Sequence, residues 1–254
     1  MDHTTPVRVL APNSVPAGRP GVEALCVVVF VMLAGVPGPI SAQDDDVSQQ
    51  IWVDYNPVWA LPDSLELYGD VGLRTQLRDR GWRKLVVRPS IRGPVGQFRW
   101  SGGVGGFFTR NDSVANRFEI RPFQGIAAIW PQRRIFHLEH YVRLEERFEW
   151  ETDTWSLDAS LRFRYHFQSR YSFSGPLENA EWQVLLHAEV FATLAGNAGQ
   201  FDENVRIGAG LERALSPAWR AGLDLTWQRR GKPFSGGHTE GFYIRVRVFQ
   251  RWLE

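Results

Sequence analysis

Charged side chains recur at every second residue through segment 135–167, where the groups most able to do chemistry are concentrated. If such charges share one enclosed space they must neutralise one another, because an unpaired charge shielded from water is costly. We therefore predict an internal network of salt bridges. The alternative is a constriction that selects a solute by charge, for which one sign should dominate, whereas both signs occur. The predicted network comprises Glu119, Arg121, Glu139, Arg143, Glu145, Arg147, Arg162, Arg164, Glu189, Arg206, Arg245 and Arg247.

Metal and cofactor chemistry find little support in the residues. His137, His166 and His187 fall on the charged rows of the alternating pattern, but none has a carboxylate at a spacing typical of a metal site. A phosphate-binding loop, a dinucleotide fingerprint and a cysteine cluster are missing from the sequence. We therefore predict no metal and no cofactor.

A lipid hydrolase is the enzyme alternative. It needs a serine and a histidine within hydrogen-bond reach near the lipid-facing surface. His140 falls on the apolar row, but we expect no serine on the neighbouring row of the next strand. Glu146 and Gln124 interrupt the apolar rows and could bind a lipid headgroup. The prediction is that the protein is not an enzyme.

The elements that position these charges are long strands. In segment 135–167, apolar residues alternate with polar ones, as in a strand rather than a helix. Strands of globular proteins usually end after about five or six residues. A tilted strand that crosses a membrane needs about nine to eleven. The pattern predicts an all-β fold, an antiparallel transmembrane β-barrel with the charged rows inside.

The same alternation continues to the end of the chain. It predicts about ten strands in a barrel domain over residues 64–254, with twelve strands as the alternative. Segment 51–59 would add an eleventh, but Pro57 removes a ladder donor there, so residues 43–63 are predicted to be a periplasmic segment with a lead-in strand. A soluble β-sandwich or lipocalin-like barrel is the rival architecture, with its apolar rows packed inward. The polar lumen of a narrow barrel leaves little room for an open porin channel.

Aromatic residues cluster near the predicted strand ends. The chain has 11 Trp and 16 Phe, and girdles at the two membrane interfaces would place aromatic rings at those positions. The predicted girdle comprises Trp130, Phe136, Phe148, Trp150, Trp155, Phe167, Trp219 and Trp227.

The N-terminal region predicts export. Arg19 precedes an apolar run over 24–34, which is broken by glycine and proline and followed by the small-residue site 40–42. The run is shorter than the roughly 20 residues of a spanning helix, so residues 1–42 are predicted to be a leader and cleavable signal peptide. Cys26, the one cysteine, falls inside it. Lys+Arg 29 against Asp+Glu 28 leaves no basic footprint for nucleic acid.

The chain resembles a known family through the runs 140–148 (HYVRLEERF), 161–165 (LRFRY) and 201–211 (FDENVRIGAGL). The family is DUF2490, a group of uncharacterised barrels, and the resemblance covers roughly Gln49 to Trp252. It implies a bacterial outer-membrane barrel and no established activity. One departure is the end of the chain, where such barrels usually finish on an aromatic residue but Leu253 and Glu254 follow Trp252.

Together these observations predict a porin-like protein of a Gram-negative outer membrane with a narrow, charge-filled lumen. Its role would be structural, interactive or the passage of a small solute. The expected partners are outer-membrane lipids, lipopolysaccharide and the barrel-assembly machinery, with no nucleic acid. A lipid-modifying enzyme and a soluble periplasmic barrel that binds a small ligand are the alternatives.

Overall fold

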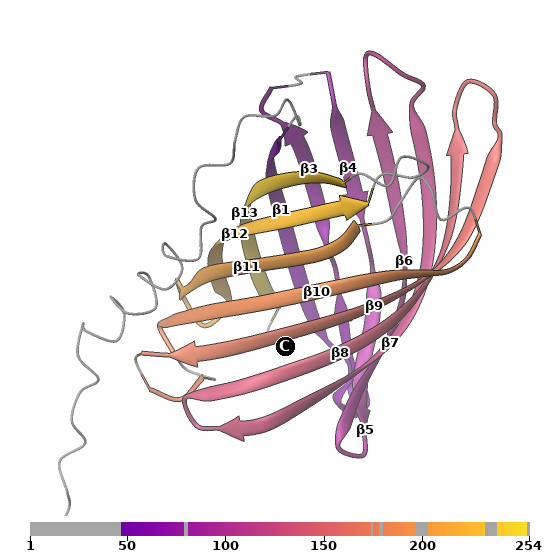
Figure 1. The fold of residues 1–254 in the computed structure, drawn as a ribbon. Coiled ribbons are helices and arrows are strands. Elements are labelled where there is room, and N and C mark those ends of the chain that lie inside the picture. Colours follow the sequence, from indigo (N-terminus) through magenta and orange to yellow (C-terminus); the bar gives the residue numbers. More distant parts are fainter. Residues whose placement is uncertain are drawn as a thin grey trace, which may run out of the picture. The chain divides into compact units, whose positions relative to one another are not determined.

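Thirteen strand segments form one continuous sheet in the computed structural model (Figure 1). The structure describes residues 47–78, 81–173, 175–177, 180–196, 203–231 and 238–252, so the predicted signal peptide, residues 1–42, lies outside it. A 3-10 turn, Pro62–Ser64, follows the first strand. None of the described residues belongs to a helix long and apolar enough to cross a membrane. The strands are β1 Ser48–Ala60, β2 Glu66–Tyr68, β3 Val71–Gln76, β4 Arg83–Val87, β5 Ser90–Val95, β6 Phe98–Arg110, β7 Arg117–Arg133, β8 Phe136–Glu151, β9 Leu157–Ser172, β10 Trp182–Gly196, β11 Glu203–Ala214, β12 Trp219–Gly231 and β13 His238–Trp252.

The sheet closes on itself into a barrel. Neighbouring strands are antiparallel, except that β1 pairs in parallel with β13 from Ser48↔Gly241 to Trp59↔Trp252. Segments β2 and β3 keep a single register against β1, and β4 and β5 keep a single register against β6, so each pair is one interrupted strand. The prediction of an all-β barrel is confirmed. The barrel has eleven strands: residues 64–254 contribute the predicted ten, and β1 from the lead-in segment is the eleventh, so the alternative of twelve is wrong.

The breaks in these two strands explain why β1 is hard to recognise as a strand from the sequence. Pro57 lacks a donor, and it lies opposite the break between β2 and β3, where the Gly69 amide donates to the Pro57 carbonyl oxygen at 2.8 Å. The second break, between β4 and β5, contains Pro89. Each missing proline donor therefore coincides with a gap in the ladder. The structure places Ser48–Ala60 of the predicted lead-in segment inside the barrel wall.

The two ends of the barrel can be named by the strands that meet there. At the Ser48 end β1 begins, and the connections after β3, β6 and β8 lie there. At the Trp252 end β13 finishes, and the connections after β1, β5, β7, β9 and β11 lie there. Because β1 and β13 are parallel, the chain enters the barrel wall at one end and leaves it at the other.

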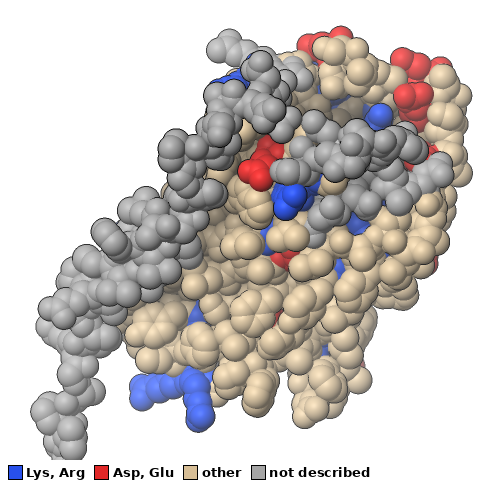
Figure 2. All heavy atoms as spheres, viewed as in Figure 1, with Lys and Arg blue, Asp and Glu red and all other residues tan. Residues whose placement is uncertain are grey.

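Polar and apolar side chains are separated between the inner and outer faces of the wall. Glu145 is buried while its outward neighbour Glu146 is exposed, and outward Val142, Leu223 and Leu225 are exposed by 38%, 57% and 55%. Figure 2 shows uncharged side chains over most of one side of the wall, with acidic residues at its upper edge and basic residues at its lower edge. The inner face therefore carries the ionisable groups, and the outer face is apolar.

Candidate functional site in the barrel interior

Side chains from around the wall fill the barrel from its middle towards the Ser48 end. Val86, Glu145 and Thr226, from three different strands, are each 0% exposed. Water reaches none of these side chains, which indicates that the lumen is filled where they lie. We call this layer the plug. It consists of Trp52, Val86, Phe107, Glu119, Arg121, Glu145, Arg147, Arg162, Phe191, Thr226, Gln228 and Tyr243, all buried.

Two carboxylates act as hubs of the plug. Glu119 accepts hydrogen bonds from Arg121 at 2.7 and 3.0 Å and from Arg147 at 2.7 Å. Glu145 accepts from Arg162 at 2.5 and 3.0 Å and from Arg121 at 3.5 Å. Each carboxylate thus accepts from guanidinium groups on at least two strands, and the hydrogen bonds join the neighbouring strands β7, β8 and β9 along the inner face of the wall.

Aromatic rings complete the filling between these ions. Arg121 lies 4.2 Å above the Phe107 ring, and Trp52 stacks on Tyr243 with ring centroids 3.7 Å apart. A guanidinium over an aromatic face keeps a favourable electrostatic contact where water is absent. The plug is therefore a packed layer rather than a water-filled charge filter.

The remaining residues of the predicted network also lie on the inner face; four of them pair within the network, and Glu139, Arg245 and Arg247 pair with residues outside it. Arg99 donates to Glu139 at 3.0 Å, and Arg164 pairs with Glu189. Other contacts join Arg206 to Glu189, Arg143 to Glu145, Arg245 to Asp54 and Arg247 to Glu212. Asp54 and Arg245 are far apart in sequence and meet because β1 pairs with β13, a pairing that the predicted barrel did not contain.

A large cavity occupies the lumen on the other side of the plug. Its volume is about 1110 Å³, and side chains from the Trp252 end line it, including the connections before β8, β10 and β12. Among the described residues, fourteen arginines line the cavity against five acidic residues, Asp70, Glu139, Glu189, Glu212 and Asp224. The sequence predicted mixed signs throughout the lumen. In the cavity, by contrast, arginines outnumber the acidic residues. Many of these arginines lie near strand ends, where the sequence pattern does not show whether a side chain will point into the lumen once the barrel closes.

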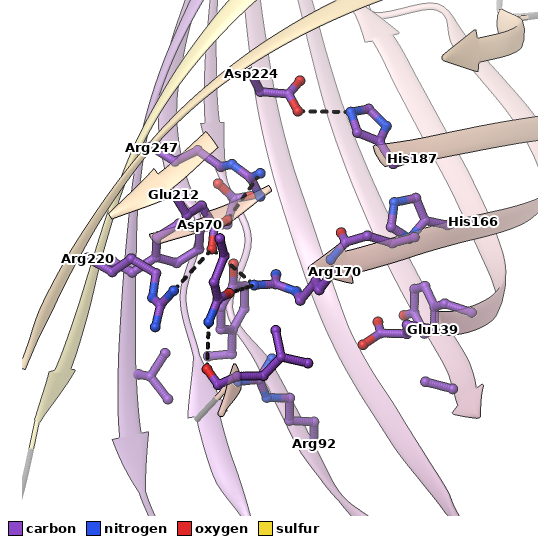
Figure 3. A pocket seen from close by; sticks show the side chains of 18 of the residues that line it. Asp70, Arg92, Glu139, His166, Arg170, His187, Glu212, Arg220, Asp224 and Arg247 are labelled. Atoms are coloured by element: carbon purple, nitrogen blue, oxygen red, sulfur yellow. Dashed lines mark hydrogen bonds and ion pairs between the residues drawn. The ribbon is translucent and has the colours of Figure 1, made fainter. Parts of the chain in front are cut away.

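The arginine excess is most concentrated around Glu212 (Figure 3). Arg170, Arg220 and Arg247 approach this single carboxylate at 3.0, 3.9 and 3.5 Å from three different strands. We call these four residues the Glu212 cluster. Of these four residues, the predicted network contained only Arg247. The inward alternation of β9, β11, β12 and β13 is the signal that would have connected all four.

A histidine–aspartate pair faces the same cavity (Figure 3). His187 Nε2 lies 2.9 Å from Asp224 Oδ2 and 3.4 Å from Thr226 Oγ1. The two strands that carry the pair are separated by β11, where Gly208 leaves the space it needs: a Cβ at Gly208 would lie 2.4 Å from His187 Nε2. The His187–Asp224 pair therefore depends on the absence of a side chain at position 208.

The predicted girdle aromatics fall at both ends of the barrel. Trp130, Phe136 and Trp219 lie at or next to connections of the Trp252 end, whereas Trp150 and Trp155 flank the connection after β8 at the Ser48 end. Trp130 and Trp155 are the most exposed, at 74% and 66%. Phe148 lies near the Ser48 end of β8, Trp227 near the Ser48 end of β12, and Phe167 towards the Trp252 end of β9.

On the outer face of the described strands, the polar residues considered for a hydrolase site lie as follows. His140 Nδ1 shares a hydrogen bond of 2.8 Å with the Tyr165 hydroxyl, and Glu146 and Gln124 are exposed on the outer face. Strand β9 continues to Ser172, so its outward row includes Ser169, contrary to the expectation that this row has no serine. Ser169 pairs with Leu138 rather than His140 in the ladder, and His140 pairs with Phe167.

Metal ligation has no support among the described residues, where no group of three or more His, Cys, Asp or Glu side chains could hold an ion. His166 and His187 lie in the cavity with ring centroids 6.0 Å apart, and His137 lines it near its mouth.

Comparison with known proteins gives one match. The sequence model of a family described as "Protein of unknown function (DUF2490)" matches residues 49–233, which covers β1 to β12. No curated protein matches the chain.

Proposed function

The chain belongs to the DUF2490 family, a family of unknown function, and we propose that its barrel spans a bacterial outer membrane as a cup closed by the plug. The observation that carries this proposal is the outer face. Among the described residues, 34 large apolar side chains are strongly exposed, and they come from strands all round the barrel. Soluble monomers rarely expose contiguous apolar patches of more than a few hundred Å². A surrounding layer of acyl chains accounts for such a face.

The length of the strands supports the same proposal. β7, β8 and β9 contain 17, 16 and 16 residues. At about 3.3 Å per residue and a tilt of about 40°, 16 residues span roughly 40 Å along the barrel axis. An apolar band about 25 Å tall therefore fits within them with polar margins at both ends.

The plug supports a cup rather than an open channel. An aqueous pore needs a continuous wet path, and the burial of Val86, Glu145 and Thr226 argues against one where they lie. We infer that the protein acts from within the membrane as a structural or ligand-holding element, with outer-membrane lipids and lipopolysaccharide as its neighbours. A water-soluble ligand-binding barrel would show the opposite polarity, with apolar rows inside.

The test combines location with conductance. The full-length chain, expressed in a Gram-negative host, is expected in the outer-membrane fraction after an alkaline carbonate wash, with a gel mobility that changes on boiling. In planar bilayers the purified barrel is expected to give no steady conductance. A soluble periplasmic monomer would overturn the membrane assignment, and a stable open channel would overturn the cup.

A further inference from the structure

We propose that the cavity at the Trp252 end is a binding site for a small polyanion, a solute with two or more phosphate or carboxylate groups. The Glu212 cluster forms its principal contact. This inference needs the cavity and its charge but not the membrane location, so the two proposals can fail separately.

The first argument is the charge that the cavity cannot neutralise. Fourteen arginines face five acidic residues in its lining. Three more carboxylates, Asp54, Glu66 and Glu145, pair with lining arginines from positions that do not line the cavity. The arginines remain in clear excess even when these are included. Positive charge held in an enclosed, low-dielectric space raises the local concentration of anions.

The second argument is the geometry of the Glu212 cluster. One carboxylate cannot satisfy three guanidinium groups, each of which carries five N–H donors. Arg220 Nη1 and Arg247 Nε are buried and have no hydrogen-bond partner among the described residues. The N–H groups of these two arginines can therefore donate to an oxyanion. A planar guanidinium group matches the oxygens of a phosphate or carboxylate in a bidentate contact.

The third argument is size and access. The cavity volume of about 1110 Å³ lies at the upper limit of the roughly 300–1,000 Å³ usual for small-molecule sites. It therefore has room for a molecule with several anionic groups rather than a single phosphate. Four of the lining arginines are open to solvent: Arg99 and Arg251 have side chains exposed by 37% and 48%, and Arg133 and Arg134 are exposed where β7 ends, so an anion can reach the site past cations.

The experiment measures binding of pyrophosphate and citrate to the purified full-length barrel in a zwitterionic detergent, by calorimetry. The double variant Arg220→Gln/Arg247→Gln is expected to weaken pyrophosphate binding at least tenfold. Glu212→Gln removes the competing carboxylate and is expected to tighten binding several-fold. Arg110→Gln is the matched control, because Arg110 is an exposed arginine at the Ser48 end paired with Asp112, and it should leave binding unchanged.

A second readout uses the unmodified protein, so that it does not depend on the variants folding. Phenylglyoxal should label Arg220 and Arg247, and pyrophosphate should protect both while leaving Arg110 labelled. A water-soluble short-chain phosphatidic acid, added in a separate arm, distinguishes a lipid headgroup from a free solute as the source of the anion. The absence of pyrophosphate and citrate binding at millimolar concentrations, or equal binding by the double variant, would overturn the proposal.

Discussion

Glu145 shows how a single buried carboxylate holds several strands of this barrel together. It is fully buried and accepts hydrogen bonds from arginines on β7, β8 and β9. Taking so many charges out of water is expensive, and the pairs are tolerated because each charge finds its counterion. Removal of the hub would leave uncompensated guanidinium groups inside the plug.

Glu145→Gln is therefore expected to lower the free energy of unfolding by at least about 3 kcal/mol, as is typical when one partner of a buried ion pair is removed. The measurement is urea unfolding of the detergent-purified barrel, followed by loss of the folded band on a gel. Asp112→Asn is the control, since Asp112 and Arg110 are exposed by 60% and 64% and should contribute no measurable stability. An equal loss of stability in Glu145→Gln and Asp112→Asn would contradict the role of Glu145 as a hub.

Gly208 provides a steric test of the interior. A Cβ there would meet His187 Nε2 at 2.4 Å and Thr226 Oγ1 at 2.5 Å. Gly208→Ala should force these side chains apart and cost about 1–3 kcal/mol, the usual cost of overpacking. Gly106→Ala is the control, because its Cβ would meet only the Val87 carbonyl oxygen at 3.8 Å. Unchanged unfolding of Gly208→Ala in urea would show that the His187–Asp224 pair relaxes without cost.

At the residue scale, alternation alone was enough to find the inward charges of β8 and β9, because neighbouring strands there are also neighbours in sequence. It could not find the Glu212 cluster, whose members come from β9, β11, β12 and β13. It also could not reveal which half of the lumen is packed and which is hollow. That division depends on rings such as Trp52 and Tyr243 that meet only when the barrel closes.

At the element scale, the outward row of β12 tests where the wall lies. Leu225 is 55% exposed in the middle of the strand, and Leu215 is 59% exposed in the connection before it. Leu225→Arg should destabilise a membrane-inserted barrel by about 2–4 kcal/mol, whereas Leu215→Arg near the interface should cost about 0–1. Unfolding from lipid vesicles in denaturant gives both values. Equal, small effects would indicate that water covers the strand.

The closure of the barrel by β1 gives a second prediction at this scale. Val53 and Val246 are register partners in the parallel pair. Cys26, the one native cysteine, lies far from both positions in sequence, so Val53→Cys/Val246→Cys should form a disulfide on mild oxidation. Tyr55→Cys/Ile244→Cys, which is offset in the same register, should not. Mass spectrometry of the oxidised barrel detects the disulfide. If Val53→Cys/Val246→Cys formed no disulfide, the pairing of β1 with β13 would be contradicted.

The long hairpin of β8 and β9 could be predicted because its apolar and polar rows alternate over most of its length, with His140 and Glu146 as exceptions on the apolar row. β1 could not be recognised as a full member of the wall, because Pro57 reads as a strand breaker when its partners are unknown. In the structure the break in the neighbouring strand faces that proline, so the missing donor costs little. β1 can therefore be the eleventh strand of the wall despite Pro57. The sequence of β1 alone does not show this, because the break lies in the neighbouring strand.

At the scale of the whole molecule, the cavity and the plug define two unlike ends. The Trp252 end holds the arginine-rich cavity and several short connections, including those over 96–97, 134–135 and 215–218. The Ser48 end carries the plug and the connections over 111–116 and 152–156, whereas the connection over 173–181, between β9 and β10, is a longer exception at the Trp252 end. Outer-membrane barrels have short turns in the periplasm and longer loops outside. The cavity should therefore open to the periplasm, where soluble polyanions can enter it.

This orientation predicts the result of labelling from one side. Val114→Cys, in the connection after β6, should react with a membrane-impermeant maleimide on intact cells, because it would face outside. Leu215→Cys, in the connection before β12, should react only after the outer membrane is permeabilised. Both native side chains are 59% exposed, so access to reagent is matched. The reverse pattern would turn the cavity towards the cell surface and make its anion an extracellular one, and equal labelling of both sites on intact cells would contradict a membrane-spanning barrel.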